Sequence, residues 1–115
     1  MKVLVAHWQD AMVALIKEHL PQCEVTCHTH GSAALAAVRS VCYDLVISSH
    51  YLPVVTGFEV VRSMRLHSPN LNSPAILLAE GNETPGHHQL AKQLDAAMLP
   101  LEEVKKMKNL ELWIS

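Results

Sequence analysis

Residues 44–60 read DLVISSHYLPVVTGFEV, which is a short aliphatic run, a turn and the start of a helical pattern. The run at 45–48 has the continuous apolar character of a strand that is covered on both faces, as in a parallel sheet. Apolar residues at helical spacing after Gly57 predict a helix that runs to about His67. The stretch therefore predicts a β-α unit whose connecting loop leads from a buried strand into a helix.

The same alternation of apolar runs and helical patterns extends in both directions along the chain. Strands are predicted at 2–6, 23–29, 45–48, 75–79 and 96–99, and helices at 10–20, 33–41, 57–67, 86–94 and from 101 or 102 to 110. A β-α unit repeated five times implies right-handed crossovers and a parallel sheet with helices on both faces. We therefore expect an α/β fold of three layers, α/β/α, with the flavodoxin-like strand order 2-1-3-4-5.

Length and composition bound the possible functions. The 115 residues are enough for one ordinary domain, 1–115, with half of the residues apolar and 17% charged. A net charge of −2 gives no basic surface for nucleic acid or for an anionic membrane, so direct contact with either is not expected. No apolar run approaches the roughly 20 residues that span a bilayer, and polar residues follow the first strand too soon for a signal peptide. The chain is therefore expected to be cytoplasmic.

In a sheet with this strand order, ligands bind outside the carboxyl ends of the first and third strands, where the order reverses. The first predicted strand ends just before His7 and Trp8, and the third ends just before Ser49 and His50. These four residues are therefore the candidates for binding or catalysis.

The stretch at 44–60 resembles the phosphoacceptor segment of bacterial response-regulator receiver domains, and the resemblance covers essentially the whole chain. In that family an Asp stands at the position of Ser49, four residues before Pro53 and eight before Gly57, and it accepts a phosphoryl group from a histidine kinase. Pro100 also matches, at a position that receivers hold after a cis peptide bond. The resemblance implies a receiver-like fold.

The resemblance also implies that the chemical groups of the family have been replaced. The acidic pair that holds magnesium in receivers corresponds to His7 and Trp8, which cannot supply the oxygen ligands that magnesium prefers. The phosphoacceptor position is Ser49, whose hydroxyl is a poor nucleophile without an adjacent base. The switch positions, which carry a hydroxyl, an aromatic ring and a lysine in receivers, are Ala79, Ala96 and Leu99. The chain thus looks like a degenerate receiver, or pseudo-receiver, with no metal or other cofactor.

Other chemistry at these positions is less favoured by the sequence. Ser49 with His7 or His50 lacks both the glycine-flanked turn of a hydrolase serine and a third residue to orient the imidazole, so an enzyme is not expected. The cysteines and histidines at 23–30 alternate between the two faces of a strand, which argues against a zinc site. Trp8 is expected to plug the pocket that the acidic pair vacates, and a small apolar or aromatic ligand stacked on the indole is the alternative.

The sequence favours a phosphorylation-independent signalling domain that acts through protein contacts; the alternative is a small-ligand sensor that uses His7, Trp8, Ser49 and His50. Receivers signal through the fourth helix, the fifth strand and the fifth helix, so we expect another signalling protein, an attached output domain or a second copy of the chain to bind there. The candidate contact residues are Leu94, Met98, Leu101, Lys105, Lys106 and Lys108. A core position for the apolar residues and a solvated helix end for the lysines are the alternative that the sequence leaves open.

Overall fold

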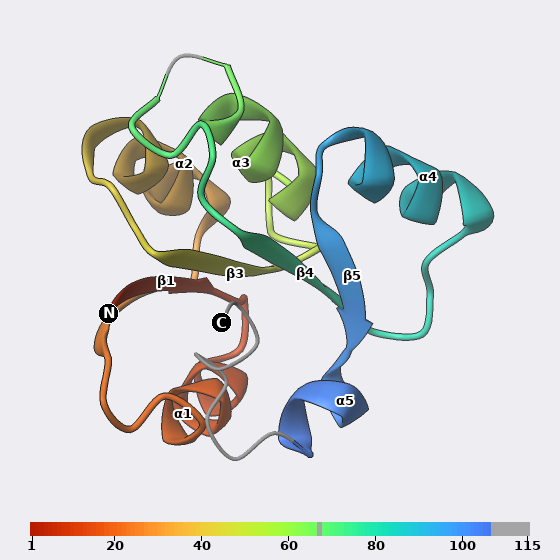
Figure 1. The fold of residues 1–115 in the computed structure, drawn as a ribbon. Helices are drawn as coiled ribbons and strands as arrows, with labels where there is room; N and C mark the ends of the chain where they lie inside the picture. The colour runs from red at the N-terminus through yellow and green to blue at the C-terminus, as the bar shows by residue number, and fades with distance from the viewer. Residues whose placement is uncertain (67, 107–115) are drawn as a thin grey trace.

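The computed structural model describes residues 1–66 and 68–106, which form five β-α units in succession (Figure 1). The strands are β1 (Lys2–Ala6), β2 (Glu24–His28), β3 (Leu45–Ser49), β4 (Ala75–Ala79) and β5 (Ala97–Pro100). The helices are α1 (Asp10–Glu18), α2 (Gly31–Ser40), α3 (Gly57–Met64), α4 (Pro85–Gln93) and α5 (Leu101–Lys105). Within the described ranges, none of the helices combines the length and the apolar content needed to traverse a bilayer.

The five strands form one sheet in the order β2-β1-β3-β4-β5, and all neighbouring strands are parallel. Figure 1 shows α1 and α5 on one face of this sheet and α2, α3 and α4 on the other. The predicted three-layer α/β/α fold with the strand order 2-1-3-4-5 is therefore confirmed. The order reverses between β1 and β3, and the carboxyl ends of these strands are where sheets of this kind bind ligands.

Each face of the sheet has its own apolar core, because successive side chains of a strand point to opposite faces. Leu4 and Ala6 of β1 pack with buried residues of α2, α3 and α4. Val3 and Val5 of the same strand pack with Ile16 of α1 and with a buried valine of α5. The strands β3 and β4 are buried along their whole length, which explains their nearly continuous aliphatic sequences.

The loop between β3 and α3 is fixed by close backbone contacts. A side chain at Gly57 would overlap the carbonyl oxygen of Ser49, so the loop requires glycine at this position. Thr56 caps α3 in a capping box with Glu59, whose amide nitrogen lies 3.2 Å from the Thr56 hydroxyl. Val54 has a φ of 69° and a side chain that is 97% exposed, so a β-branched residue occupies the left-handed region without being buried. These constraints fix how the chain turns after Ser49 at the edge of the sheet.

Some element ends differ from those predicted. α3 ends at Met64 rather than near residue 67, because the Ser68 hydroxyl donates a hydrogen bond of 2.7 Å to the Met64 carbonyl and closes the helix. β5 covers Ala97–Pro100 rather than 96–99, since the amide of Ala96 still bonds back to α4. No described peptide bond is cis, so the cis bond expected before Pro100 is not observed. The predicted extension of the last helix to 110 lies outside the described residues.

Candidate functional site

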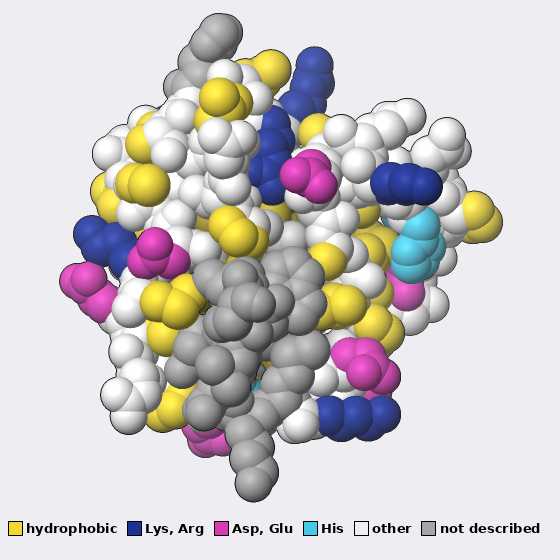
Figure 2. Space-filling view, viewed as in Figure 1, with side chains coloured by type: hydrophobic (Ala, Val, Ile, Leu, Met, Phe, Trp, Pro, Cys, Tyr) yellow, Lys and Arg dark blue, Asp and Glu magenta, His cyan; other side chains and the backbone are white. Residues whose placement is uncertain are grey.

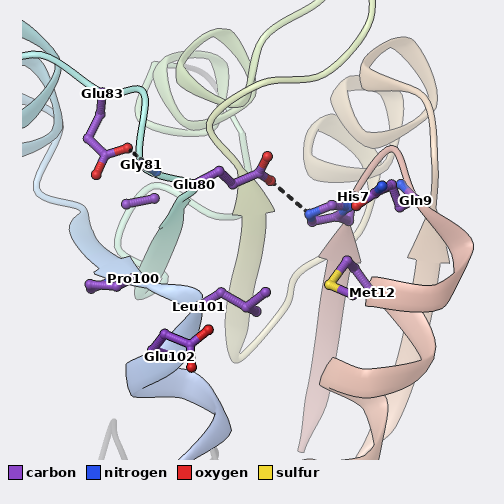
Figure 3. Close-up of a pocket in the computed structure, with 10 residues that line it drawn as sticks. His7, Gln9, Met12, Glu80, Gly81, Glu83, Pro100, Leu101 and Glu102 are labelled. Atoms are coloured by element: carbon purple, nitrogen blue, oxygen red, sulfur yellow. Dashed lines mark hydrogen bonds and ion pairs between the residues drawn. The ribbon is translucent and has the colours of Figure 1, made fainter.

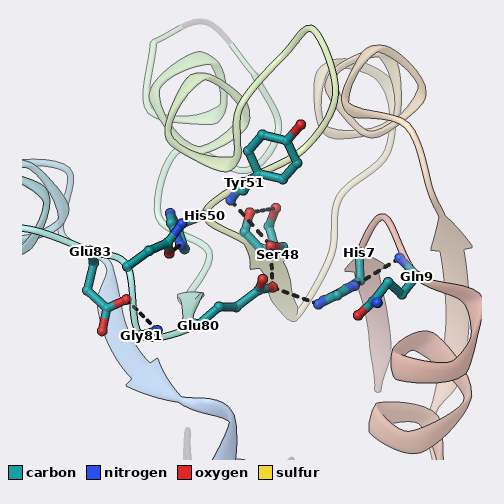
Figure 4. A network of polar contacts seen from close by, with 10 residues as sticks. His7, Gln9, Ser48, His50, Tyr51, Glu80, Gly81 and Glu83 are labelled. Atoms are coloured by element: carbon teal, nitrogen blue, oxygen red, sulfur yellow. Dashed lines mark hydrogen bonds and ion pairs between the residues drawn. The ribbon is translucent and has the colours of Figure 1, made fainter.

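A buried polar network lies at the carboxyl ends of β1, β3 and β4 (Figure 4). The Ser49 hydroxyl donates to Glu80 Oε1 at 2.8 Å, and His7 Nε2 donates to the same oxygen at 2.8 Å. Ser49 is 0% exposed and His7 is 1% exposed, while the Glu80 side chain is 25% exposed. One carboxylate oxygen therefore joins the ends of the first and third strands where the strand order reverses.

The protonation state of His7 follows from its two contacts. Its Nδ1 accepts a hydrogen bond of 3.0 Å from the amide of Gln9, so the hydrogen of the neutral ring is on Nε2, which faces Glu80. Burial lowers the pKa of His7, and the Glu80 carboxylate raises it by less. Although the distance between His7 and Glu80 is that of an ion pair, at neutral pH the contact is a hydrogen bond from a neutral imidazole to a carboxylate.

His7 should make the domain less stable as the pH falls. An unfolded chain protonates its histidines near pH 6.5, whereas the lowered pKa of His7 keeps the ring neutral there in the folded state. The unfolded state then binds more protons, so the free energy of unfolding decreases from about pH 6.5 downward until His7 is itself protonated in the folded state. Urea midpoints measured over a series of pH values should decrease less in a His7→Gln variant than in the parent protein. An equal decrease in both proteins would contradict this assignment.

The order of the groups in the network does not match a hydrolase triad. In a triad the imidazole stands between the hydroxyl and the carboxylate and takes the hydroxyl proton. Here the Glu80 carboxylate stands between Ser49 and His7, and the His7 nitrogen that faces it already carries a hydrogen. The amide of Tyr51 also donates to Ser49 Oγ at 3.3 Å. These bonds hold the Ser49 hydroxyl in place as both donor and acceptor, and its hydrogen faces a carboxylate rather than an imidazole.

Trp8 does not plug the pocket, so the sequence-based prediction for this residue is wrong. The indole is 41% exposed; it stacks on the His7 ring at a centroid distance of 5.9 Å and meets Tyr51 edge-on at 6.3 Å. The amide of His7 bonds to the His28 carbonyl and so continues the strand by one residue, which turns His7 inward and Trp8 outward. His7 therefore occupies the buried position that the prediction gave to Trp8.

His50 is buried at 6% exposure but belongs to a different set of contacts. Its Nε2 bonds with Asn82 Oδ1 at 2.9 Å, and its ring packs against Phe58 and His87 at centroid distances of 6.3 Å and 5.8 Å. Of the four residues predicted at the crevice, His7 and Ser49 are joined through Glu80, Trp8 stacks on His7, and His50 makes separate contacts. Glu80 is not among the residues predicted from the sequence, although its place directly after the apolar run of β4 puts it at the same edge of the sheet.

A cavity of about 450 Å³ opens beside the network, at the carboxyl ends of β1, β4 and β5 (Figure 3). Its lining residues are His7, Gln9, Met12, Ala79, Glu80, Gly81, Glu83, Pro100, Leu101 and Glu102. Figure 3 shows Glu80 extended toward His7, and Glu83 on the loop that follows β4. Of the four predicted site residues, only His7 lines this cavity.

The three predicted switch positions carry small or aliphatic side chains that contribute to packing. Ala79 is 5% exposed at the end of β4, directly before Glu80. Ala96 packs against the core beneath α2, α3 and α4, and Leu99 packs against the core beneath α1 and α5. These side chains have no hydrogen-bonding atoms, so they cannot form a hydrogen bond or an ion pair with a charged group at Ser49.

The network does not fit the magnesium ion that receivers hold at the corresponding place. Magnesium takes oxygen ligands in a near-octahedral arrangement, usually with one or two carboxylates. The carboxylate of Glu80 already accepts hydrogen bonds from Ser49 and His7, and neither imidazole nor indole supplies an oxygen ligand. Across residues 1–66 and 68–106, no three His, Cys, Asp or Glu side chains are grouped so that they could hold a metal ion.

The predicted contact residues divide between core and surface. Leu94 and Met98 are half-buried and pack against the core beneath α2, α3 and α4, whereas half-buried Leu101 lines the cavity. Lys105 and Lys106 are exposed and lie 3.5 Å from glutamates one turn earlier in α5. Lys108 lies outside the described residues. Figure 2 shows acidic and basic side chains together over α5, with hydrophobic side chains between α5 and α4.

Solved structures of receiver domains share this fold. The chemotaxis response regulator CheY4 of Vibrio cholerae is 27% identical, with a TM-score of 0.77 over 91% of this chain and 92% of that chain. The Francisella response regulator 1452 receiver domain is 22% identical, with a TM-score of 0.77 over 98% of this chain and 97% of that chain. A receiver domain from Rhodospirillum rubrum is 16% identical, with a TM-score of 0.81 over 99% of this chain and 93% of that chain.

Comparison with sequence families gives a different result from comparison of structures. No family model and no curated protein matches the chain. The chain has the fold of response-regulator receiver domains.

Proposed function

We propose that this chain is a phosphorylation-independent, receiver-like signalling domain that acts through protein contacts. The observation that supports this most strongly is the single carboxylate oxygen of Glu80, which is held by both Ser49 and His7. Where receivers gather acidic groups around a phosphoacceptor, this chain ties a buried hydroxyl and a neutral imidazole to one glutamate. A phosphoryl group placed there would meet the Glu80 carboxylate, and like charges at such a distance repel.

The replaced switch positions support the same proposal. A receiver that signals through phosphorylation needs polar or aromatic side chains that change position, whereas Ala79, Ala96 and Leu99 are packed and have no polar atoms. A phosphoryl group shifts a domain between two conformations only if its contacts differ between them, and these three side chains offer it no polar contact in either conformation. We therefore infer that the output of this domain is the binding of a partner by its resting conformation.

The proposed contact surface is formed by α4, β5 and α5. Only Ala91 of α4 is buried, so this helix leaves most of its side chains available, including Leu90 at 38% exposure. Leu94 and Met98 are half-buried beside it, and Lys105 and Lys106 add charge at the edge. The partner would be another signalling protein, an attached output domain or a second copy of the chain.

The contact surface is tested by two variants with matched chemistry. Leu90→Glu puts a charge on α4, and Leu71→Glu puts the same charge on the loop before β4, where Leu71 is 48% exposed. We expect the parent protein to form a dimer or to retain a specific partner in affinity capture, with at least about a tenfold loss for Leu90→Glu and little change for Leu71→Glu. A parent protein that is monomeric and captures nothing, or equal binding by both variants, would contradict the proposal.

A second candidate function, the sensing of a small ligand, is favoured by the cavity of about 450 Å³. Its lining combines carboxylates of Glu80, Glu83 and Glu102 with the apolar side chains of Met12 and Leu101. This chemistry suits a small organic cation with an apolar part. Such a ligand should raise the melting temperature of the parent protein and should raise that of Glu102→Gln less. Alkylamines and guanidines with no effect at millimolar concentration would exclude this candidate.

A further inference from the structure

The helix α4 is attached to the domain by few buried contacts. Of its nine residues only Ala91 is buried, and the two turns are otherwise exposed or half-buried. A helix this short is marginal in water unless tertiary packing or capping supports it. The start of α4 therefore depends on its cap and on the side chains packed under its first turn.

The cap of α4 is a capping box in which histidine takes the place of the usual glutamate or glutamine. Thr84 Oγ1 accepts the amide hydrogen of His87 at 3.3 Å, and His87 Nδ1 accepts the amide hydrogen of Thr84 at 3.1 Å. A glutamate or glutamine remains an acceptor throughout the physiological pH range. An imidazole nitrogen accepts a hydrogen bond only while it is unprotonated, so this cap is complete only when the His87 ring is neutral.

Protonation of His87 would act against the helix in two ways. The Nδ1 atom would become a donor facing the Thr84 N–H, and that half of the capping box would be lost. A positive charge would also lie in the first turn of α4, at the end where the helix dipole disfavours cations. Both effects have the same sign, so acidification weakens the start of α4.

The His50 ring beside His87 strengthens this dependence. Its ring lies 5.8 Å from the ring of His50 and 5.5 Å from the ring of Phe58, measured between centroids. His50 is 6% exposed and is held by Asn82, so it cannot move away from a charged His87 without breaking that contact. Two imidazolium rings at this distance would repel each other.

The other charged groups around the two rings do not cancel the effect. From α3, Glu59 and Arg62 line the same groove as His87 with opposite charges. From the loop before α4, Glu83 accepts a hydrogen bond from the Gly81 amide, and hydrogen bonds with the backbone hold the pKa of its carboxyl low. The nearby His50 and His88 lower this pKa further.

We propose that α4 is a pH-sensitive element of this domain: protonation of His87 breaks the Thr84–His87 capping box and releases the first turn of the helix. The groove between α3 and α4, a cavity of about 500 Å³ floored by Phe58 and bordered by Leu90 and Leu94, changes shape with it. This device is independent of the phosphorylation question, because His87 and Thr84 lie outside the network of Ser49, Glu80 and His7.

The test is an NMR titration of the whole chain from about pH 7.5 to about pH 5, an interval that spans the ordinary titration of histidine. The helical Cα secondary shifts of residues 85–88 should decrease over this pH range as the first turn loses its cap, while those of α2 stay constant. His87→Gln restores the usual capping-box residue and should keep these shifts constant to the acid end. His88→Gln, which leaves the capping box intact, should behave as the parent protein does.

Three results would overturn the proposal. The first is a parent protein whose shifts at 85–88 do not change over the titration. The second is a His87→Gln variant that loses helical shifts to the same extent as the parent, which would assign the effect to another group. A change that appears equally in α2 would mark general unfolding, and it would also count against a local device in α4.

Discussion

Replacing Asn70 with alanine is expected to lower the free energy of unfolding by about 4 kcal/mol. The Asn70 side chain is fully buried, and its loss would leave three backbone groups without hydrogen-bond partners. Asn70 Oδ1 accepts from the amide of Tyr43 at 2.6 Å. Its Nδ2 donates to the carbonyls of Val38 and Val41 at 2.8 Å and 2.6 Å. The side chain thus ties the end of α2 and the approach to β3 to the loop that precedes β4. Urea denaturation measures the loss.

Asn72→Ala is the matched control for this prediction. Asn72 is exposed on the same loop, and its replacement should change stability by less than about 0.5 kcal/mol. A loss below about 1 kcal/mol for Asn70→Ala would mean that water or a neighbouring group satisfies the three backbone groups, and the account of this corner of the fold would be wrong.

Replacing Glu80 with alanine is expected to cost about 2 kcal/mol, since it removes the acceptor shared by His7 and Ser49. The cost is smaller than for Asn70 because the Glu80 side chain is 25% exposed, so water can reach part of the site. Glu80→Gln keeps an acceptor oxygen and should cost less than about 1 kcal/mol. Denaturation of the three proteins under the same conditions gives the comparison.

Glu102→Ala is the control for the Glu80 variants, because Glu102 lines the same cavity but is exposed and does not touch Ser49 or His7. Its removal should leave stability nearly unchanged. Equal losses for Glu80→Ala and Glu102→Ala would show that the effect comes from the general charge of the cavity, and the specific network would then carry no stability of its own.

The fold could be predicted from the sequence because its signals are local. The aliphatic runs of β1, β3 and β4 and the helical patterns between them fix the number and order of elements, and parallel packing follows from burial on both faces. Element ends could not be predicted as closely, since side-chain hydrogen bonds such as that of Ser68 to the Met64 carbonyl decide them. The hydrogen bonds of the Asn70 side chain reach residues that lie 27 to 32 positions away in the sequence, and no periodic pattern predicts them.

The site could be predicted only in part, for a related physical reason. The position of His7 and Ser49 at the switch point of the sheet could be predicted, because strand ends are visible in the sequence. The hydrogen bond from the His7 amide to the His28 carbonyl extends the strand pairing by one residue, and this decides whether His7 or Trp8 turns inward. Because His7 turns inward, the prediction for Trp8 is wrong. Glu80 was missed because its role arises from contacts with two other strands.

The central claim is that the edge of the sheet at Ser49 cannot take up a phosphoryl group with magnesium, and NMR of the amide groups tests it most directly. The amide spectrum of the protein would be recorded before and after addition of beryllofluoride with magnesium, and again after addition of acetyl phosphate. An active receiver domain would serve as the positive control. We predict that the amide spectrum of this protein stays unchanged. Chemical-shift changes centred on Ser49, Glu80 and the following loop would contradict the account.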